Sequence, residues 1–143
     1  MRISKSTERG EHTSLNFHIA CTRNRLLIAR PAIDCGYDVI VHNPITNGMW
    51  RVQVKTAQPL KGGRYWVGST HRRRGERYSP GLIQRFVFAS PDREGFWIID
   101  GERFEGRTGR GLTDKYWNKW DLFDVQSELH SSTARLTKPD SDS

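Results

Sequence analysis

The sequence has only two cysteines, and it lacks long hydrophobic runs and internal repeats. Cys21 and Cys35 form no CxxC pair and have no histidine at zinc-like spacing, so neither a structural zinc site nor a disulfide framework is predicted. Residues 1–13 contain no apolar stretch of the signal-peptide type, and no run approaches the length of a membrane span. These absences favour a soluble cytoplasmic protein with reduced thiols.

Acidic residues are also scarce relative to basic ones. The chain has 16 Asp and Glu against 23 Lys and Arg, a formal net charge of +7. Such an excess points to a polyanionic partner such as nucleic acid without identifying it. With 143 residues and 35% hydrophobic residues, the chain is long enough for one packed core. We therefore expect one domain over residues 1–128 and a flexible tail over 129–143, which has no apolar periodicity.

Two segments have the pattern of helices. Apolar residues recur at helical spacing from Ser14 to about Ala29, and Pro31 would end this helix. A second helix is predicted over 115–125, KYWNKWDLFDV, with Thr113 or Asp114 as its cap.

Five segments have the composition of strands and are separated by turn residues. They are 36–43, 50–58, 64–69, 85–90 and 96–100. Asn47 and Gly48 between the first two are a strong hairpin signal. The predicted fold class is α/β (α+β), with a central mixed sheet of about five strands flanked by helices.

The strand WRVQVKTAQ, residues 50–58, has an unusual second face. Its alternate residues from Trp50 are mainly apolar, whereas Arg51, Gln53 and Lys55 share the opposite face. For most strands such a polar face simply meets solvent.

Asp38 suggests a chemical reason for that face. On the inferred hairpin it lies across from the strand that carries Gln53 and Lys55. A carboxylate, an oxygen ligand and a lysine two residues further on can form a metal site with a general base or a charge stabiliser.

These residues resemble a known family. The order of a helix, then P..D..YD, then VQVKTA, from Gly10 to Lys55, is similar to the PD-(D/E)XK nuclease superfamily. The resemblance is to the branch of small homing-type endonucleases in which glutamine replaces the second acid. It extends through RYWVGST, RFVFASPDREGFWIID and YWNKWDLF to about residue 124. It implies a restriction-endonuclease-like fold and hydrolysis of phosphodiester bonds in double-stranded DNA.

The resemblance also implies roles for four residues. Mg²⁺ (or Mn²⁺) would be held by the Asp38 carboxylate, the Gln53 side-chain oxygen and the Val54 carbonyl. Lys55 would orient or deprotonate the attacking water and offset charge in the transition state. Because glutamine supplies less charge than glutamate, metal affinity without DNA is expected to be low.

The chain departs from the family pattern at two positions. Ser14 stands where such nucleases carry a glutamate on the first helix, and Gln84 stands where relatives often carry an acid. Glu11 would share a helix face with Ser14, so it is either a replacement metal ligand and catalytic acid or a surface or capping residue. The resulting site is poor in acids, so a slow or inactive nuclease remains an alternative interpretation.

Basic residues supply candidate DNA contacts. The segment HRRRGER, His71–Arg77, can reach the DNA backbone, and neighbouring cations extend the surface. The candidate contacts are Arg51, Lys61, Arg64, His71, Arg72, Arg73, Arg74 and Arg77.

Four further polar residues carry weaker signals. Asp34 is either a supporting acid or a turn residue, and Tyr78 either touches a phosphate or packs. Structural roles are expected for His18 and His42, which lack partners at ligand spacing.

The predicted function is that of a metal-dependent, sequence-specific, homing-type DNA endonuclease. We expect it to act as a homo-oligomer, a dimer or tetramer, because one small site cuts one strand. A bacterial or phage-infected cell is the expected location. The alternatives are a junction-resolving or repair nuclease on the same fold and a nuclease-like DNA-binding protein without cleavage.

Overall fold

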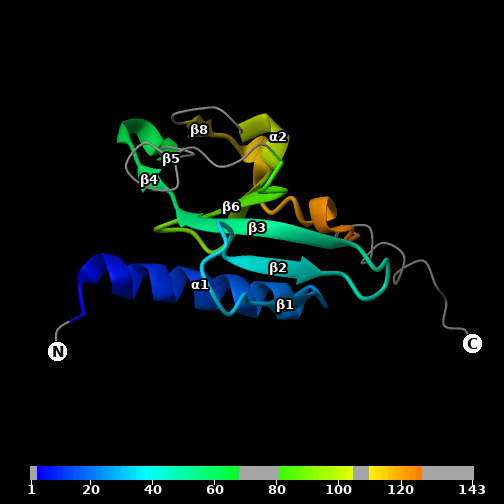
Figure 1. Cartoon of the computed structure of the whole chain (residues 1–143). Helices are drawn as coiled ribbons and strands as arrows, with labels where there is room; N and C mark the ends of the chain where they lie inside the picture. Colours follow the sequence, from blue (N-terminus) through cyan, green and yellow to red (C-terminus); the bar gives the residue numbers. More distant parts are fainter. Residues whose placement is uncertain (1–2, 68–80, 105–109, 127–143) are drawn as a thin grey trace, which may run out of the picture.

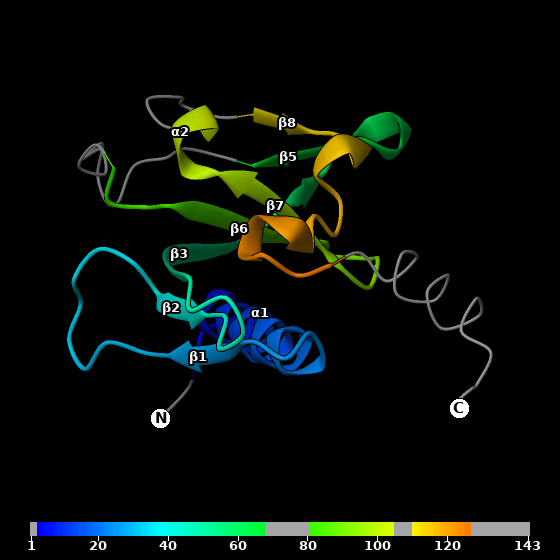
Figure 2. The same cartoon turned by 90° about the vertical axis from the view of Figure 1, so that its right-hand side faces the viewer.

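The computed structural model describes residues 3–67, 81–104 and 110–126, and its centre is a five-stranded mixed sheet (Figure 1). The sheet order is β1-β2-β3-β6-β7. A long helix, α1, lies against one face, and a three-stranded sheet of order β4-β5-β8 lies beyond the other. Figure 2 shows the same layers after a 90° turn, with β5 and β8 on the side of the central sheet opposite α1.

The elements of the central sheet and its helix are α1 (Lys5–Arg23), β1 (Leu27–Ala29), β2 (Val39–His42), β3 (Met49–Thr56), β6 (Arg85–Ala89) and β7 (Phe96–Asp100). The remaining elements are β4 (Gln58–Pro59), η1 (Lys61–Gly63), β5 (Tyr65–Val67), α2 (Gly101–Phe104), β8 (Arg110–Leu112), η2 (Asp114–Tyr116) and η3 (Trp120–Phe123).

Helix α1 is displaced from the predicted helix at both ends. It begins after Ser4, whose hydroxyl accepts from the Thr7 N–H at 3.1 Å. It ends at Arg23 because Asn24 caps it and Arg25 takes a left-handed conformation (φ 60°). The prediction that the helix continues to Ala29 is wrong. Leu27–Ala29 instead forms the edge strand β1, whose backbone pairs with β2.

The predicted hairpin is confirmed. Strands β2 and β3 pair antiparallel, with Val39 opposite Val52. Asn47 adopts φ 67° in the turn, a conformation that asparagine tolerates well. The turn is also tied to η3, because the Asn43 side chain donates to the Phe123 carbonyl at 2.9 Å.

The sheet is mixed because β3 pairs parallel with β6, whereas β6 and β7 pair antiparallel. The predicted fold class, with its mixed sheet of about five strands, is therefore confirmed. One member differs from the prediction. The segment 64–69 contributes β5 to the small sheet, and β1 takes the fifth place in the central sheet.

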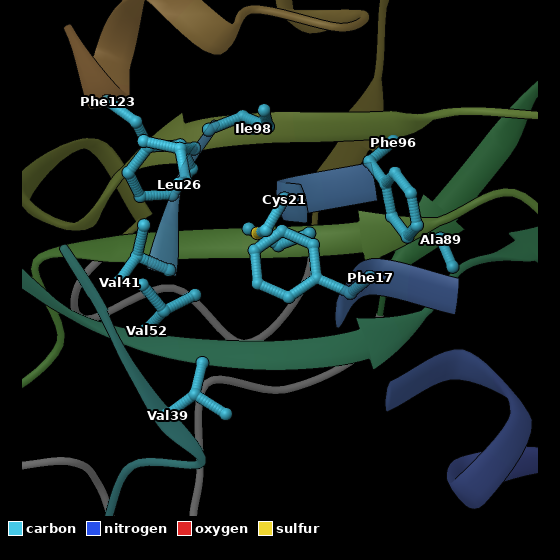
Figure 3. Close-up of a cluster of buried hydrophobic side chains, with 11 residues drawn as sticks. Phe17, Cys21, Leu26, Val39, Val41, Val52, Ala89, Phe96, Ile98 and Phe123 are labelled. Carbon is cyan, nitrogen blue, oxygen red and sulfur yellow. The ribbon is translucent and has the colours of Figure 1, made fainter. Parts of the chain in front are cut away.

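Two clusters of buried side chains lie on the two faces of the central sheet. The first joins α1 to the sheet (Figure 3), where the Phe17 ring meets the edge of Phe96 at 5.5 Å between centroids. The second contains Phe86, Phe88 and Trp97 and packs under the small sheet and α2. Burying each large apolar side chain contributes about 1.5–3 kcal/mol.

The predicted helix over 115–125 is absent, and two short 3₁₀ turns, η2 and η3, take its place. Asn118 adopts φ 51°, and its backbone N–H and side-chain oxygen bond to the backbone of Phe96 in β7. This pairing with the sheet competes with helical hydrogen bonds. Thr113 precedes η2 but makes no capping hydrogen bond through its side chain.

Other predictions fall outside the described residues. The proposed tail, 129–143, is one of them, as are the candidate contacts between His71 and Arg77. Within the described ranges, no helix combines the length and apolar character needed to cross a bilayer.

Candidate active site

The polar face of β3 lies on the side of the sheet away from α1. In the parallel register, Gln53 pairs with Phe86 and Lys55 with Phe88, and both phenylalanines belong to the second cluster. Val52 belongs to the first cluster, under α1. Gln53 and Lys55 are half-buried. The alternation seen in the sequence therefore corresponds to two distinct environments.

Asp38 lies at the end of the hairpin, immediately before β2. Its N–H donates to the carbonyl of Val52 at 3.0 Å, the same residue of β3 that pairs with Val39, so Asp38 is held against β3 just beyond the paired register. Its Oδ2 accepts a hydrogen bond from the Val54 N–H at 2.9 Å. The carboxylate is thus fixed at the edge of β3, at the point where β2 ends.

The Val54 carbonyl faces the same edge. The N–H of Ala57 donates to Ala89 at the end of β6, so the odd-numbered residues of β3 direct their backbone groups toward β6. The backbone groups of Val54 point the other way, toward Asp38. Because β2 has already ended, the Val54 carbonyl, the Asp38 carboxylate and the adjacent Gln53 amide supply oxygen atoms around one stretch of strand edge.

This donor set fits a small hard cation. Carboxylate, amide and backbone carbonyl oxygens suit Mg²⁺, which keeps several waters when it is bound by proteins. Among the described residues, no three His, Cys, Asp or Glu side chains gather closely enough to hold a metal. The set fits Mg²⁺ only because neutral oxygens supplement Asp38.

The pKa of Asp38 is raised from its ordinary value, mainly because neighbouring protein atoms displace water from the carboxylate. The Val54 N–H and the charges of Lys55 and Arg30 oppose this effect, and Asp34 adds to it. The Asp38 residue as a whole is still exposed to solvent, so the desolvation of its carboxylate is partial. Sequence analysis did not identify Arg30, whose position follows from the chain path between β1 and β2.

The pKa of Lys55 is lowered, again mainly by desolvation, while the negative charge of Asp38 raises it in part. A larger fraction of Lys55 is therefore neutral near physiological pH than for a solvated lysine. An amine of this kind can accept a proton or, when charged, offset negative charge nearby.

Glu11 and Ser14 lie on the same side of α1. At about 100° of rotation per residue around the helix axis, Glu11 lies about 120° and Ser14 about 60° from the buried Phe17. Arg23 lies about 120° from Phe17 in the opposite direction. Arg23 reaches Glu94 in the connection between β6 and β7, with 3.5 Å between Nη1 and Oε1. Glu11 and Ser14 therefore lie on the side of α1 turned away from the connection between β6 and β7.

The two positions differ in burial. Glu11 is exposed, whereas Ser14 is half-buried and follows Thr13, whose hydroxyl contacts the Thr56 hydroxyl at 2.7 Å. Ser14 is thus level with the end of β3. Glu11 lies almost one turn further toward the helix N-terminus.

Gln84 has a backbone role that sequence analysis missed. Its Oε1 accepts from the Arg51 N–H at 2.9 Å, and its own N–H donates to the Arg51 carbonyl at 2.9 Å. The side chain therefore extends the β3–β6 ladder. The Arg51 guanidinium is also engaged, because it donates to the carbonyls of Leu82 (2.8 Å) and Gly81 (3.1 Å).

The remaining candidates are placed as follows. Asp34 accepts from the Gly36 N–H at 3.1 Å, the geometry of a turn aspartate. His42 contacts Asn47 within the hairpin turn at 3.1 Å, and His18 is exposed on α1. Lys61 and Arg64 are exposed between β4 and β5. The residues outside the described ranges are His71, Arg72, Arg73, Arg74, Arg77 and Tyr78.

Comparison with known proteins gives matches by structure. No family model matches the chain, and no curated protein matches it. The bacterial homing endonuclease I-Ssp6803I superposes with a TM-score of 0.66 and 19% identity, covering 94% of this chain and 98% of that one. A Holliday junction resolvase, Hjc of Archaeoglobus fulgidus, gives a TM-score of 0.54 with 6% identity, covering 84% and 99%.

At these identities the comparisons establish the fold. The resemblance to PD-(D/E)XK nucleases that was inferred from the residues is confirmed at that level.

Proposed function

We propose that this chain is a metal-dependent DNA endonuclease, with Asp38, Gln53, Val54 and Lys55 at its active site. The observation that carries the proposal is the hydrogen bond between Asp38 Oδ2 and the Val54 N–H, which holds the carboxylate beside the Gln53–Lys55 stretch. The similarity in fold to a homing endonuclease and a junction resolvase supports the same conclusion.

Each residue has a defined task in this proposal. Asp38, Gln53 and the Val54 carbonyl hold a divalent cation, Mg²⁺ or Mn²⁺, which supplies positive charge to the scissile phosphate when bound. Lys55 Nζ positions the attacking water and takes its proton, or offsets the charge that develops on the phosphate. The desolvation that lowers the pKa of Lys55 suits either task.

The substrate proposed is double-stranded DNA, cut at a specific sequence as by homing enzymes. Contacts with phosphates are assigned to the basic residues given above, with Lys61 and Arg64 the exposed members among the described residues. We propose that the chain acts as a homo-oligomer, a dimer or tetramer, because cutting both strands needs two sites. We place it in the cytoplasm of a bacterial or phage-infected cell.

Metal removal tests the proposal directly. Supercoiled plasmid incubated with the protein is expected to be nicked or linearised in Mg²⁺ or Mn²⁺ and to stay intact in EDTA. Adding Mg²⁺ in excess of the EDTA should restore cleavage. A four-way junction cut in preference to duplex DNA would favour the resolvase alternative. DNA binding without cleavage in either metal would support the inactive binding protein instead.

The acid on α1 is tested by a pair of substitutions. We propose that Glu11 is the second acid of the site, so Glu11→Gln should greatly lower cleavage at limiting Mg²⁺ and raise the Mg²⁺ concentration needed for half-maximal rate. Ser14→Glu places a carboxylate at a half-buried position level with the end of β3. In the Glu11→Gln background it should restore part of the rate.

Glu8→Gln is the matched control, since Glu8 is exposed in the first turn of α1. Full Mg²⁺-dependent activity in Glu11→Gln would show that Glu11 is a surface residue. In that case Ser14→Glu alone should lower the Mg²⁺ requirement of an otherwise wild-type protein.

A further inference from the structure

The small sheet β4-β5-β8 is a direct continuation of the strand that carries the candidate site. Strand β3 ends at Thr56, and β4 begins at Gln58. In the small sheet Gln58 pairs with Trp66 of β5, and Trp66 pairs with Gly111 of β8. Because directly paired residues share a face, these three positions form one row across the sheet.

The two faces of this sheet differ sharply. Val67 is buried, and the Tyr65 ring lies 4.8 Å from Trp97 in the second cluster, with its hydroxyl donating to Asp92 at 2.7 Å. The row of Gln58 and Trp66 therefore faces outward. Trp66 is 39% exposed, and it is the one exposed tryptophan of five, all of which lie in the described ranges.

The flank of Trp66 is open. Its partner on one side is Gly111, which has no side chain, and its partner on the other is the exposed Gln58. An indole face and an amide with both donor and acceptor atoms are thus presented together.

The segments of this sheet carry charge of one sign. Residues 57–67 include two exposed basic residues, Lys61 and Arg64, and no acidic one. An isolated exposed aromatic residue needs no special explanation. Here the aromatic residue, an amide and basic residues occur together on a sheet joined to the candidate active site. This combination complements duplex DNA, which offers a polyanionic backbone and base edges in its grooves.

We propose that the outer face of the small sheet contacts DNA bases beside the scissile phosphate, with Gln58 as a specificity residue. This rests on the proposed nuclease function. Gln58 follows Lys55 by three residues, a reach of about 10 Å in extended chain. With successive base pairs about 3.4 Å apart, Gln58 and Trp66 contact the duplex about three base pairs from the cut. A glutamine amide can pair with an adenine edge, while Trp66 packs against a neighbouring nucleotide.

Cleavage of a DNA library randomised on both sides of the cut tests the role of Gln58. Gln58→Ala should lower base discrimination about tenfold at a position within a few base pairs of the cut, with little change at distant positions. Gln126→Ala, an exposed glutamine at the far end of the described chain, is the matched control and should leave the profile unchanged. If the wild type cuts and Gln58→Ala keeps the wild-type profile, the inference is wrong while the nuclease function stands.

Fluorescence tests the same surface without cleavage. Duplex DNA in EDTA should quench the tryptophan emission of the wild type, and Trp66→Phe should lose most of that quenching. Anisotropy of labelled DNA measures binding independently, and a melting curve confirms that Trp66→Phe is folded. DNA binding with equal quenching in both proteins would overturn the inference. Absence of both binding and cleavage by the wild type would overturn the proposed function together with it.

Discussion

Lys55→Ala is expected to lower the cleavage rate by about two to three powers of ten, because removing one preorganised electrostatic group commonly has an effect of this size. Lys55 lies on the half-buried face of β3 beside Asp38. Desolvation lowers its pKa, so its amine can accept a proton more readily near neutral pH than that of a solvated lysine. The substitution should leave the fold and DNA affinity almost unchanged. Single-turnover rates measure the chemical step, and anisotropy without added metal measures binding.

Two companion variants sharpen this test. Lys119→Ala removes a half-buried lysine that pairs with Asp121 at 3.2 Å, and it should cut at the wild-type rate. Lys55→Arg keeps the positive charge but cannot act as a base, because a guanidinium stays protonated. Recovery of activity by arginine would identify charge stabilisation as the role of Lys55. Undiminished cutting by Lys55→Ala would remove Lys55 from the mechanism.

Asp38→Asn is the second large effect that we expect. With Asp38 as the carboxylate fixed at the edge of β3, asparagine would remove the negative charge around which the neutral oxygens of Gln53 and Val54 are arranged. Cleavage in Mg²⁺ should fall by about two powers of ten or more, in line with the loss of a central electrostatic group. Calorimetry with Mn²⁺ should show weaker metal binding. Wild-type activity in Mg²⁺ would exclude the metal-site assignment.

The same variant should not lose stability. Because the pKa of Asp38 is raised in the folded state, the folded protein binds this proton more tightly than the unfolded chain. The stabilisation that protonated Asp38 contributes is fully present below the pKa of Asp38 in the unfolded chain. It is lost as the pH rises through the pKa of Asp38 in the folded protein. The asparagine introduced by Asp38→Asn stays neutral at every pH, and its side-chain oxygen can still accept from the Val54 N–H.

Melting temperatures check this pH dependence. Asp38→Asn should melt at or above the wild-type temperature in neutral buffer, with a smaller difference in acidic buffer. Asp114→Asn is the control, since Asp114 is exposed in η2 and is not among the groups that shift the pKa of Asp38. A variant that melts well below the wild type at neutral pH would show that the ionised carboxylate stabilises the fold.

The sequence by itself determined the elements whose pattern is local. The alternation around Gln53 and Lys55 and the Asn47-Gly48 turn predicted the β2–β3 hairpin, because strand periodicity and turn conformation depend on neighbouring residues. The hairpin in turn placed Asp38 across from the strand that carries Gln53 and Lys55, and the hydrogen bond from the Val54 N–H to Asp38 Oδ2 joins the two. The candidate site could therefore be assembled from residues 38–55 without a structure.

The tertiary structure decided what depends on distant partners. Residues 27–29 follow a helical pattern in sequence, yet they form a strand because the edge of β2 offers backbone partners. The segment 115–125 lost its helix because Asn118 bonds to Phe96 in β7. In both cases long-range hydrogen bonds outweigh a weak local propensity.

The surroundings of the site were likewise outside the reach of sequence. Gln84 pairs with the backbone of Arg51, and Trp66 faces outward from a separate small sheet, although its segment was predicted as a strand of the central one. The side of α1 on which Glu11 and Ser14 lie was fixed only by how the helix packs. Alternation predicts two faces for a strand, but only packing decides which sheet it joins and what each face meets.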